Sequence, residues 1–173
     1  MKIVGISGNT YPNSTNLKVL EKIGSELTIL GHSFDVIHEV KELPLFNPQT
    51  EFQERYEIVN QMRNKIKAAD FLIIVSPEYM GGVPAILKNA LEWMLSEATL
   101  MQKPVAFVIH SPIGKHAVEA LNRHLSIMGA ELKDEWQLLI SYNQRIERED
   151  GWFQDEAINK QVKILIQNIN STP

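Results

Sequence analysis

Hydrophobic positions follow two different spacings along the chain. Short apolar runs rich in β-branched residues predict strands, and apolar residues three and four positions apart predict amphipathic helices. The predicted strands, in chain order, are residues 2–6, 33–38, 71–75, 105–109 and 136–140. The predicted helices span residues 17–27, 56–68, 85–96, 117–128 and 158–169, and a proline-containing loop is expected at 41–53.

Strands that alternate with helices in this way predict a parallel sheet covered by helices on both faces. The runs 71–75 and 105–109 are apolar at every position, which is typical of central strands buried on both faces. Five strands in a short chain favour the α/β flavodoxin-like doubly wound sheet, with strand order 2-1-3-4-5, over the Rossmann order. We expect residues 1–173 to form a single domain. Ligands of such sheets bind beyond the carboxyl ends of the strands, so the loops after strands one, three and four are the candidate site.

The amino-acid composition excludes several kinds of functional site. The 173 residues include no Cys, which excludes disulfides, iron–sulfur clusters, thiolate zinc sites and Cys nucleophiles, so redox chemistry would need a bound cofactor. A net charge of −4 gives no basic surface for nucleic acid. No apolar run is long enough for a membrane span or a signal peptide, and we expect a cytoplasmic protein with no membrane partner. The five histidines lack the close spacing of metal ligands, so no metal site is expected.

The loop after the first strand is dense in hydroxyl and amide side chains and leads into a helix. The free N–H groups and the dipole at a helix start favour an anion. Ser14, Thr15 and Asn16 can each donate to a phosphate, so this loop predicts a phosphate monoester held mainly by neutral donors. The alternative is that Ser14 or Asn16 only caps the helix. The Gly-rich patterns of dinucleotide and triphosphate loops are absent.

The loop after the third strand contains two adjacent glycines, Gly81 and Gly82, which let backbone approach a flat ligand closely. Tyr79 could cover an aromatic ring, and Pro84 is well placed to begin the next helix. The alternative is a plain strand-to-helix turn that carries a surface tyrosine.

These two loops carry a family resemblance. Residues 77–93 read Pro-Glu-Tyr-Met-Gly-Gly-Val-Pro-Ala-Ile-Leu-Lys-Asn-Ala-Leu-Glu-Trp. They resemble the signature Pro-Glu-Tyr-Asn-x-Ser-x-Pro-x-x-Leu-Lys-Asn-Ala-x-Asp-Trp of the NAD(P)H-dependent FMN reductase family, which includes azoreductases, chromate reductases and small quinone reductases. Residues 8–16 resemble that family's phosphate motif, Gly-Ser-x-Arg-x-x-Ser-x-Asn, and the similarity spans roughly residues 1–128.

The resemblance implies a flavodoxin-like fold that binds FMN. The residues that it assigns to the phosphate are Asn9, Tyr11, Ser14, Thr15 and Asn16. The residues that it assigns to the flavin ring, largely through backbone, are Pro77, Glu78, Tyr79, Met80 and Gly81, and those of the third loop are His110, Ser111 and Gly114. Two departures matter: Tyr11 replaces the family's Arg and removes a positive charge, and Met80 replaces its Asn.

The function that we expect is an FMN-dependent NAD(P)H oxidoreductase. It would pass two electrons by ping-pong from the nicotinamide through the flavin to a quinone, an azo compound, free flavin or a metal oxyanion. Because FMN carries the chemistry, no catalytic side chain is required. The resemblance also implies a homodimer or homotetramer. Two alternatives remain: a non-enzymatic FMN electron carrier, and a flavodoxin-like binding protein that has lost flavin. Tyr11, Met80 and the third loop, which keeps only Gly114 of the family's glycines and gains Pro112, motivate the second alternative.

Overall fold

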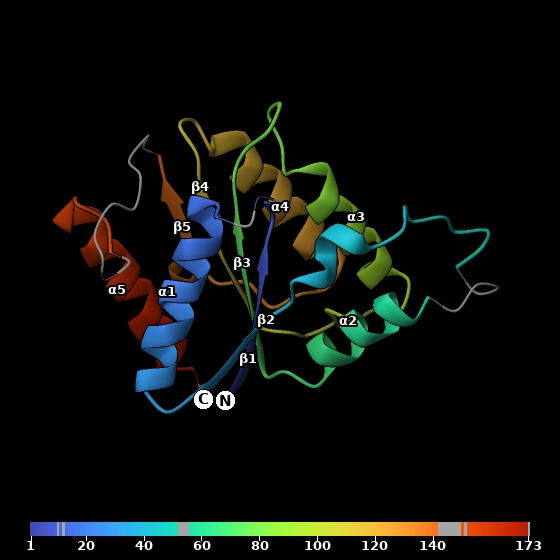
Figure 1. The fold of residues 1–173 in the computed structure, drawn as a ribbon, viewed down its shortest axis with the longest axis horizontal. Helices are drawn as coiled ribbons and strands as arrows, with labels where there is room; N and C mark the ends of the chain where they lie inside the picture. The colour runs from blue at the N-terminus through green and yellow to red at the C-terminus, as the bar shows by residue number, and fades with distance from the viewer. Residues whose placement is uncertain (10, 12, 52–55, 142–149, 151, 173) are drawn as a thin grey trace.

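Five parallel strands form one sheet in the order β2-β1-β3-β4-β5 (Figure 1). The computed structural model describes residues 1–9, 11, 13–51, 56–141, 150 and 152–172. The strands are β1 (Lys2–Ser7), β2 (Ser33–Val36), β3 (Phe71–Ser76), β4 (Val105–His110) and β5 (Gln137–Ile140). Each pairs in parallel with its neighbours, so the predicted flavodoxin-like strand order is confirmed.

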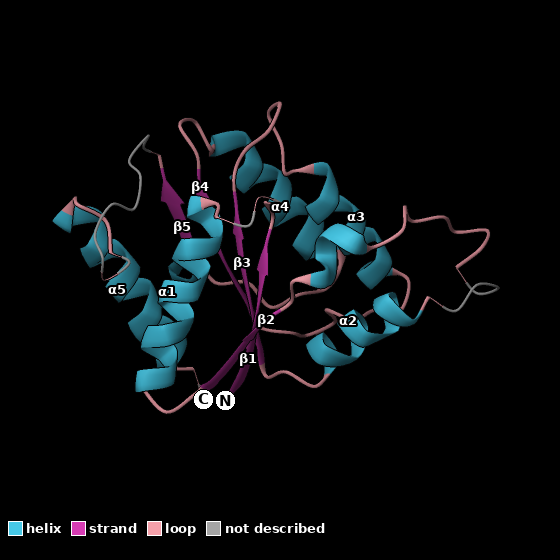
Figure 2. Ribbon diagram, in the orientation of Figure 1, coloured by secondary structure: helices cyan, strands magenta, loops and turns pink. Residues whose placement is uncertain are grey.

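Helices cover both faces of this sheet, as Figures 1 and 2 show. The α-helices are α1 (Thr15–Ile29), α2 (Glu57–Lys67), α3 (Ala85–Leu95), α4 (Lys115–Ile127) and α5 (Glu156–Asn170). Two 3-10 turns, η1 (Glu39–Glu42) and η2 (Asp134–Trp136), precede α2 and β5. Helices α1 and α5 pack together on one face, and α2, α3 and α4 lie on the other.

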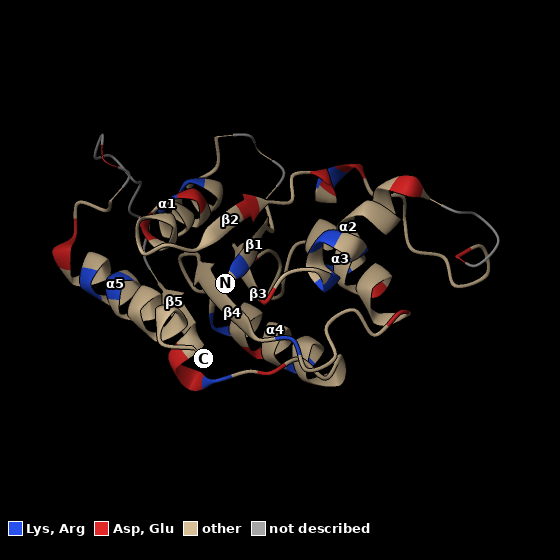
Figure 3. Cartoon of the chain, turned by 90° about the horizontal axis from the view of Figure 1, so that it is seen from below, with Lys and Arg blue, Asp and Glu red and all other residues tan. Residues whose placement is uncertain are grey.

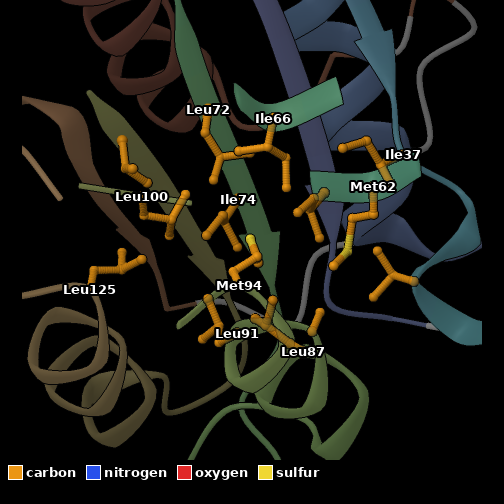
Figure 4. Close-up of a cluster of buried hydrophobic side chains, with 14 of the residues drawn as sticks. Ile37, Met62, Ile66, Leu72, Ile74, Leu87, Leu91, Met94, Leu100 and Leu125 are labelled. Atoms are coloured by element: carbon orange, nitrogen blue, oxygen red, sulfur yellow. The ribbon is translucent and has the colours of Figure 1, made fainter. Parts of the chain in front are cut away.

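The alternation of side chains along each strand divides the apolar residues into two cores. Leu72 and Ile74 of β3 pack in the core beneath α2, α3 and α4, part of which Figure 4 shows. Phe71 and Ile73 point the other way, into the core beneath α1 and α5. All residues of β3 and β4 are buried, which explains why these strands read as unbroken apolar runs.

Each core contains one fully buried tryptophan. Trp93 of α3 lies in the first core and Trp136 of η2 in the second, each 1% exposed. The rings of Phe46 and Tyr56 pack edge-on against Trp93 at centroid distances of 5.1 and 5.5 Å. Both tryptophans therefore serve to pack the two cores.

The long connection between β2 and α2 differs from its prediction. The predicted loop at 41–53 is described as far as residue 51, and the 3-10 turn η1 begins just before it. The Pro44 carbonyl accepts from Trp93 Nε1 at 2.8 Å and from Asn89 Nδ2 at 2.9 Å. The Phe46 N–H donates to Asn89 Oδ1 at 2.8 Å. This connection is therefore held against α3 by two side chains of that helix.

A buried ion pair holds the far end of the same connection. Arg63 Nη2 lies 2.5 Å from Glu51 Oε1, and their side chains are only 5% and 3% exposed. Arg63 Nε also donates to the Trp93 carbonyl at 2.8 Å, and Nη1 lies 3.0 Å from Glu97 Oε1. The helix predicted at residues 56–68 is present as α2, and one of its charged side chains points inward.

Charged positions are spread over the outer helices, where basic and acidic residues are interspersed (Figure 3). None of the helices in the described residues combines the length and apolarity that a membrane crossing requires.

Candidate functional site

Three loops meet at the carboxyl edge of the sheet because β1, β3 and β4 are neighbours. They are residues 8–14 after β1, 77–84 after β3 and 111–114 after β4, at the top of the view in Figure 1. The first loop is described except at positions 10 and 12. All the predicted site residues lie on these loops or on the ends of the adjoining elements.

Gly8 brings the first loop against β3. Its N–H donates to the Val75 carbonyl at 2.8 Å. A Cβ at this position would lie 2.4 Å from Ser76 Oγ and 2.8 Å from Ser76 Cβ, and Ser76 is fully buried. Only a residue without a side chain allows this approach, so Gly8 sets how close the first loop comes to the second.

The start of α1 combines a helix cap with donors that remain available. Ser14 Oγ accepts from the Leu17 N–H at 3.1 Å, so Ser14 does cap the helix, as the alternative interpretation expected. Capping leaves the Ser14 O–H proton free to donate elsewhere. Helix geometry provides no acceptor for the N–H groups of Thr15 and Asn16.

Asn16 is the residue of this site whose surroundings most favour a bound ligand. It is 5% exposed, yet its Oδ1 atom is buried without a hydrogen-bond partner among the described residues. Buried polar atoms in proteins are nearly always hydrogen-bonded. Because Oδ1 only accepts, a hydroxyl of the ligand would be its donor, while the phosphate oxygens would face the N–H groups of Thr15 and Asn16 and the Ser14 hydroxyl. The residues present therefore fit a phosphorylated ligand such as FMN.

Asn9 connects the first and second loops. Its Oδ1 accepts from the Tyr11 N–H at 2.9 Å, and its Nδ2 donates to the Tyr79 hydroxyl at 3.3 Å. The Tyr11 and Tyr79 side chains are both more than half exposed, at 64% and 53%. Two residues predicted for opposite ends of the flavin, Asn9 and Tyr79, are thus in direct contact.

The second loop contains a tight two-residue turn. The N–H of Tyr79 donates to the Gly82 carbonyl at 2.9 Å, and the N–H of Gly82 donates back at 3.0 Å. Met80 and Gly81 occupy the tip with φ of +50° and +71°. Positive φ at both positions is typical of a type I′ turn, which explains the glycine at 81. The Met80 side chain is fully exposed, and its predicted contact with a flavin ring stays a prediction.

Glu78 joins the second loop to the third. Its Oε2 accepts from the Ala117 N–H at 2.9 Å, in the first turn of α4. A carboxylate is favourable at a helix N-terminus because it faces free N–H groups and the positive end of the dipole. The Glu78 side chain therefore positions the two loops relative to each other, and Pro77, just before it, is buried.

The third loop is held by β5 and the second core. His110 ends β4, is 9% exposed, and its ring lies 5.6 Å from that of Phe153. The Ser111 N–H donates to the Ile140 carbonyl at 3.2 Å. Gly114 precedes α4 with φ of +75°, where a Cβ would lie 2.3 Å from Leu139 Cδ1. Backbone of this loop is therefore firmly placed, and its contact with flavin stays a prediction.

A cavity of about 270 Å³ lies on the other side of the first loop, over the ends of β1 and β2. Its polar lining combines Asn9 and Tyr11 with three residues that sequence reasoning did not assign to a site: Glu21, His38 and Lys41. The signal that could have found them is position, because His38 closely follows β2 at the ligand-binding edge of the sheet. Nowhere in the described residues, this cavity included, is a group of three or more His, Asp or Glu placed to hold a metal ion.

Comparison with known proteins identifies relatives of one kind. A family model described as NADPH-dependent FMN reductase matches residues 1–143. An NADPH azoreductase of a Bacillus species is 33% identical over 130 residues, which are 75% of this chain and 70% of that protein. A quinone reductase of Pseudomonas putida is 31% identical over 110 residues, 62% of this chain and 58% of that protein.

A solved structure shares the fold. FerB, a flavoenzyme NAD(P)H:(acceptor) oxidoreductase from Paracoccus denitrificans, matches with a TM-score of 0.85 and 23% identity, over 98% of this chain and 94% of that one. At this level of identity, the likeness is evidence for the common architecture alone.

Proposed function

This chain belongs to the NADPH-dependent FMN reductase family, and from that membership we propose that it passes two electrons by ping-pong from NAD(P)H through FMN to a small acceptor. The acceptor classes that we propose are quinones, azo compounds, free flavin and metal oxyanions. Two of these classes appear in the names of the relatives, an azoreductase and a quinone reductase.

The observation that carries this proposal is the start of α1. Two free backbone N–H groups and the Ser14 hydroxyl converge there, beside the buried and unpartnered Oδ1 atom of Asn16. The N–H groups and the hydroxyl would hold the phosphate of FMN without a nearby Lys or Arg in residues 8–16. When bound, FMN supplies two-electron hydride chemistry, which no side chain of the chain could provide.

The other two loops would orient and enclose the ring. Backbone of residues 77–81 offers hydrogen-bonding groups on the second loop, and the bond from Ala117 to Glu78 fixes that loop to the start of α4. Tyr79, half exposed at the end of the loop, would cover an aromatic face and exclude water from it. Because one open face would serve reductant and acceptor in turn, we expect parallel lines in double-reciprocal plots, and intersecting lines would contradict the ping-pong scheme.

The test of the proposed function is a comparison of FMN binding and NAD(P)H oxidation in the natural chain and in Ser14→Asp. Aspartate caps a helix as well as serine does, so the variant keeps its fold. Its carboxylate would repel the FMN phosphate, and we expect FMN affinity to fall about 100-fold, or about 3 kcal/mol. Flavin fluorescence titration measures this loss.

The matched control is Ser25→Asp, which adds the same charge on the exposed side of α1. We expect it to bind FMN as the natural chain does. If Ser14→Asp also binds FMN unchanged, the phosphate does not lie at this helix start. Flavin binding without NAD(P)H oxidation would instead indicate an electron carrier, and a chain that stays colourless after FMN addition would indicate a binding protein that has lost flavin.

We also propose that residues 1–173 work as a single FMN-binding domain in a homodimer or homotetramer. Leu95, Met101 and Ile127, near the ends of α3 and α4, are exposed by 48%, 59% and 68%. Apolar side chains gathered in this way favour association. Light scattering coupled to size-exclusion chromatography would give the mass, and a strictly monomeric chain would contradict this part of the proposal.

A further inference from the structure

We propose that the cavity over β1 and β2 binds the 2′-phosphorylated ribose of NADPH, and that Lys41 makes the enzyme prefer NADPH to NADH. This inference rests on the proposed function, because it assigns a binding place to the adenosine half of NADPH. It adds a specificity-determining residue outside the three loops considered so far.

The strand order separates this cavity from the flavin ring. In the sheet, β2 lies on one side of β1, whereas β3 and β4 lie on the other. A flavin with its phosphate at the start of α1 and its ring beside the loops after β3 and β4 extends away from β2. The cavity shares Asn9 and Tyr11 with the first loop and touches Ile86 of α3, but the largest part of its lining, residues 36–41, continues toward β2. It is therefore next to the proposed phosphate site, and most of it lies on the side away from the proposed ring position.

The size of the cavity suits part of a dinucleotide. A volume of about 270 Å³ is slightly below the range of about 300 to 1,000 Å³ typical of whole small-molecule pockets. The distance from β2 to β3 across β1 is two strand spacings, or about 10 Å. A dinucleotide can bridge this span, with its nicotinamide beside the flavin and its adenosine ribose over β2.

The polar lining matches a ribose that carries a phosphate. Lys41 offers an ammonium group and His38 a second donor, both from the connection after β2. Glu21 of α1 offers a carboxylate on the same cavity. A 2′-phosphorylated ribose presents an anion next to a free hydroxyl, so Lys41 would pair with the phosphate while Glu21 accepts from the hydroxyl. Tyr11 adds an exposed aromatic ring against which a sugar or base can pack.

Lys41 would strengthen the binding of NADPH far more than the binding of NADH. Both reductants carry the ribose, but only NADPH carries the 2′-phosphate. Without that phosphate, the exposed Lys41 ammonium stays in water at little cost. A charge-assisted hydrogen bond contributes about 1.5–3 kcal/mol, which corresponds to about 10-fold to 100-fold in affinity.

The experiment compares kcat/KM for NADPH and NADH in the natural chain, in Lys41→Gln and in Lys18→Gln. Lys18 is an exposed lysine of α1 outside the cavity lining and serves as the charge-matched control. We expect the natural chain and Lys18→Gln to prefer NADPH. In Lys41→Gln, kcat/KM for NADPH should fall at least about 10-fold through KM, while the value for NADH changes far less. An equal loss for both reductants, or no preference in the natural chain, would overturn the assignment.

A binding measurement separates this inference from the proposed function. Adenosine 2′-phosphate should bind the FMN-loaded protein in calorimetry without releasing FMN, and Lys41→Gln should weaken this binding by a similar factor. Adenosine 5′-phosphate should bind more weakly than adenosine 2′-phosphate. If adenosine 2′-phosphate displaces FMN, the cavity belongs to the flavin and the inference fails. A chain that binds no FMN and oxidises no NAD(P)H contradicts the proposed function instead.

Discussion

Gly8 shows how one residue without a side chain can control a binding loop. Its neighbour across the sheet, Ser76, is fully buried and has no space to move aside. We expect Gly8→Ala to push the first loop away from β3 and to lower FMN affinity about 10-fold, with the chain still folded. Flavin titration together with a thermal unfolding curve would check both parts.

A second substitution tests the cause of this loss. Ser76→Ala in the Gly8→Ala background removes the Oγ atom that lies nearest to the added methyl group. We expect this double variant to recover part of the FMN affinity. No recovery would mean that the loss does not arise from this contact.

At the scale of single residues, the sequence predicts which residues can donate hydrogen bonds at the site. It does not predict which of their polar atoms have partners in the folded chain. Ser14 and Asn16 stand out because hydroxyl and amide side chains precede a helix at the sheet edge. Whether the side-chain Oδ1 of Asn16 has a hydrogen-bond partner depends on residues that are distant in the sequence. No local sequence pattern reveals them. The bond between Asn9 and Tyr79 joins positions 70 residues apart and is hidden for the same reason.

Among the elements, the connection from β2 to α2 is held by a buried ion pair. Removing Glu51 would take away the buried carboxylate at Arg63 Nη2 and leave Glu97, at Nη1 and partly exposed, as the ionic partner. We expect Glu51→Ala to lower the free energy of unfolding by about 3 kcal/mol, because removing one partner of a buried ion pair is strongly unfavourable. Urea unfolding monitored by circular dichroism would measure it.

Glu97→Ala is the matched control, because Glu97 also pairs with Arg63 but is 38% exposed. A solvent-exposed ion pair contributes at most about 1 kcal/mol. Similar losses in the two variants would show that burial of the Glu51–Arg63 pair does not determine its contribution.

Local periodicity identifies the helices and strands well because apolar side chains must face one of two cores. The α4 boundary illustrates the limit: the helix begins at Lys115, ahead of the predicted start at Ala117, since Gly114 and the Glu78 carboxylate complete its first turn. The buried Arg63 was missed because a charged residue within a polar helix reads as solvent-facing, and its partners lie on two other segments.

The stability of the whole molecule should depend on pH through His124. Burial between α3 and α4 lowers the pKa of this imidazole below its ordinary value of 6.5, and the positive charges of Lys88 and Arg123 act in the same direction. The unfolded chain then binds a proton more readily than the folded one as pH falls below about 6.5, so this group makes the fold less stable in acid.

His124→Gln should reduce that dependence. We expect its melting temperature to fall less than that of the natural chain between about pH 7.5 and about pH 5.5. The control is His116→Gln, an exposed histidine on the same helix, which should keep the natural slope. A natural slope in His124→Gln would show that other groups cause the acid sensitivity.

The arrangement of the whole sheet could be predicted from the sequence because alternating strands and helices leave few topologies. The rule that ligands bind near the first, third and fourth strands directed attention to three loops. It directed attention away from β2, and the cavity containing His38 and Lys41 lies there. Its lining comes from β1, the first loop, α1, α3 and the segment from the end of β2 to η1, whose proximity follows only from tertiary packing.

The two cores also provide the protein with natural optical probes. Trp93 reports on one face of the sheet and Trp136 on the other, and both are shielded from water. Two variants would each keep a single tryptophan: one keeps Trp93 and the other Trp136, with the half-buried Trp152 and the remaining tryptophan replaced by phenylalanine. The tryptophan fluorescence of each variant would then report on one face of the sheet only. Stopped-flow fluorescence of such a pair would tell whether the two halves of the interior assemble together or one after the other.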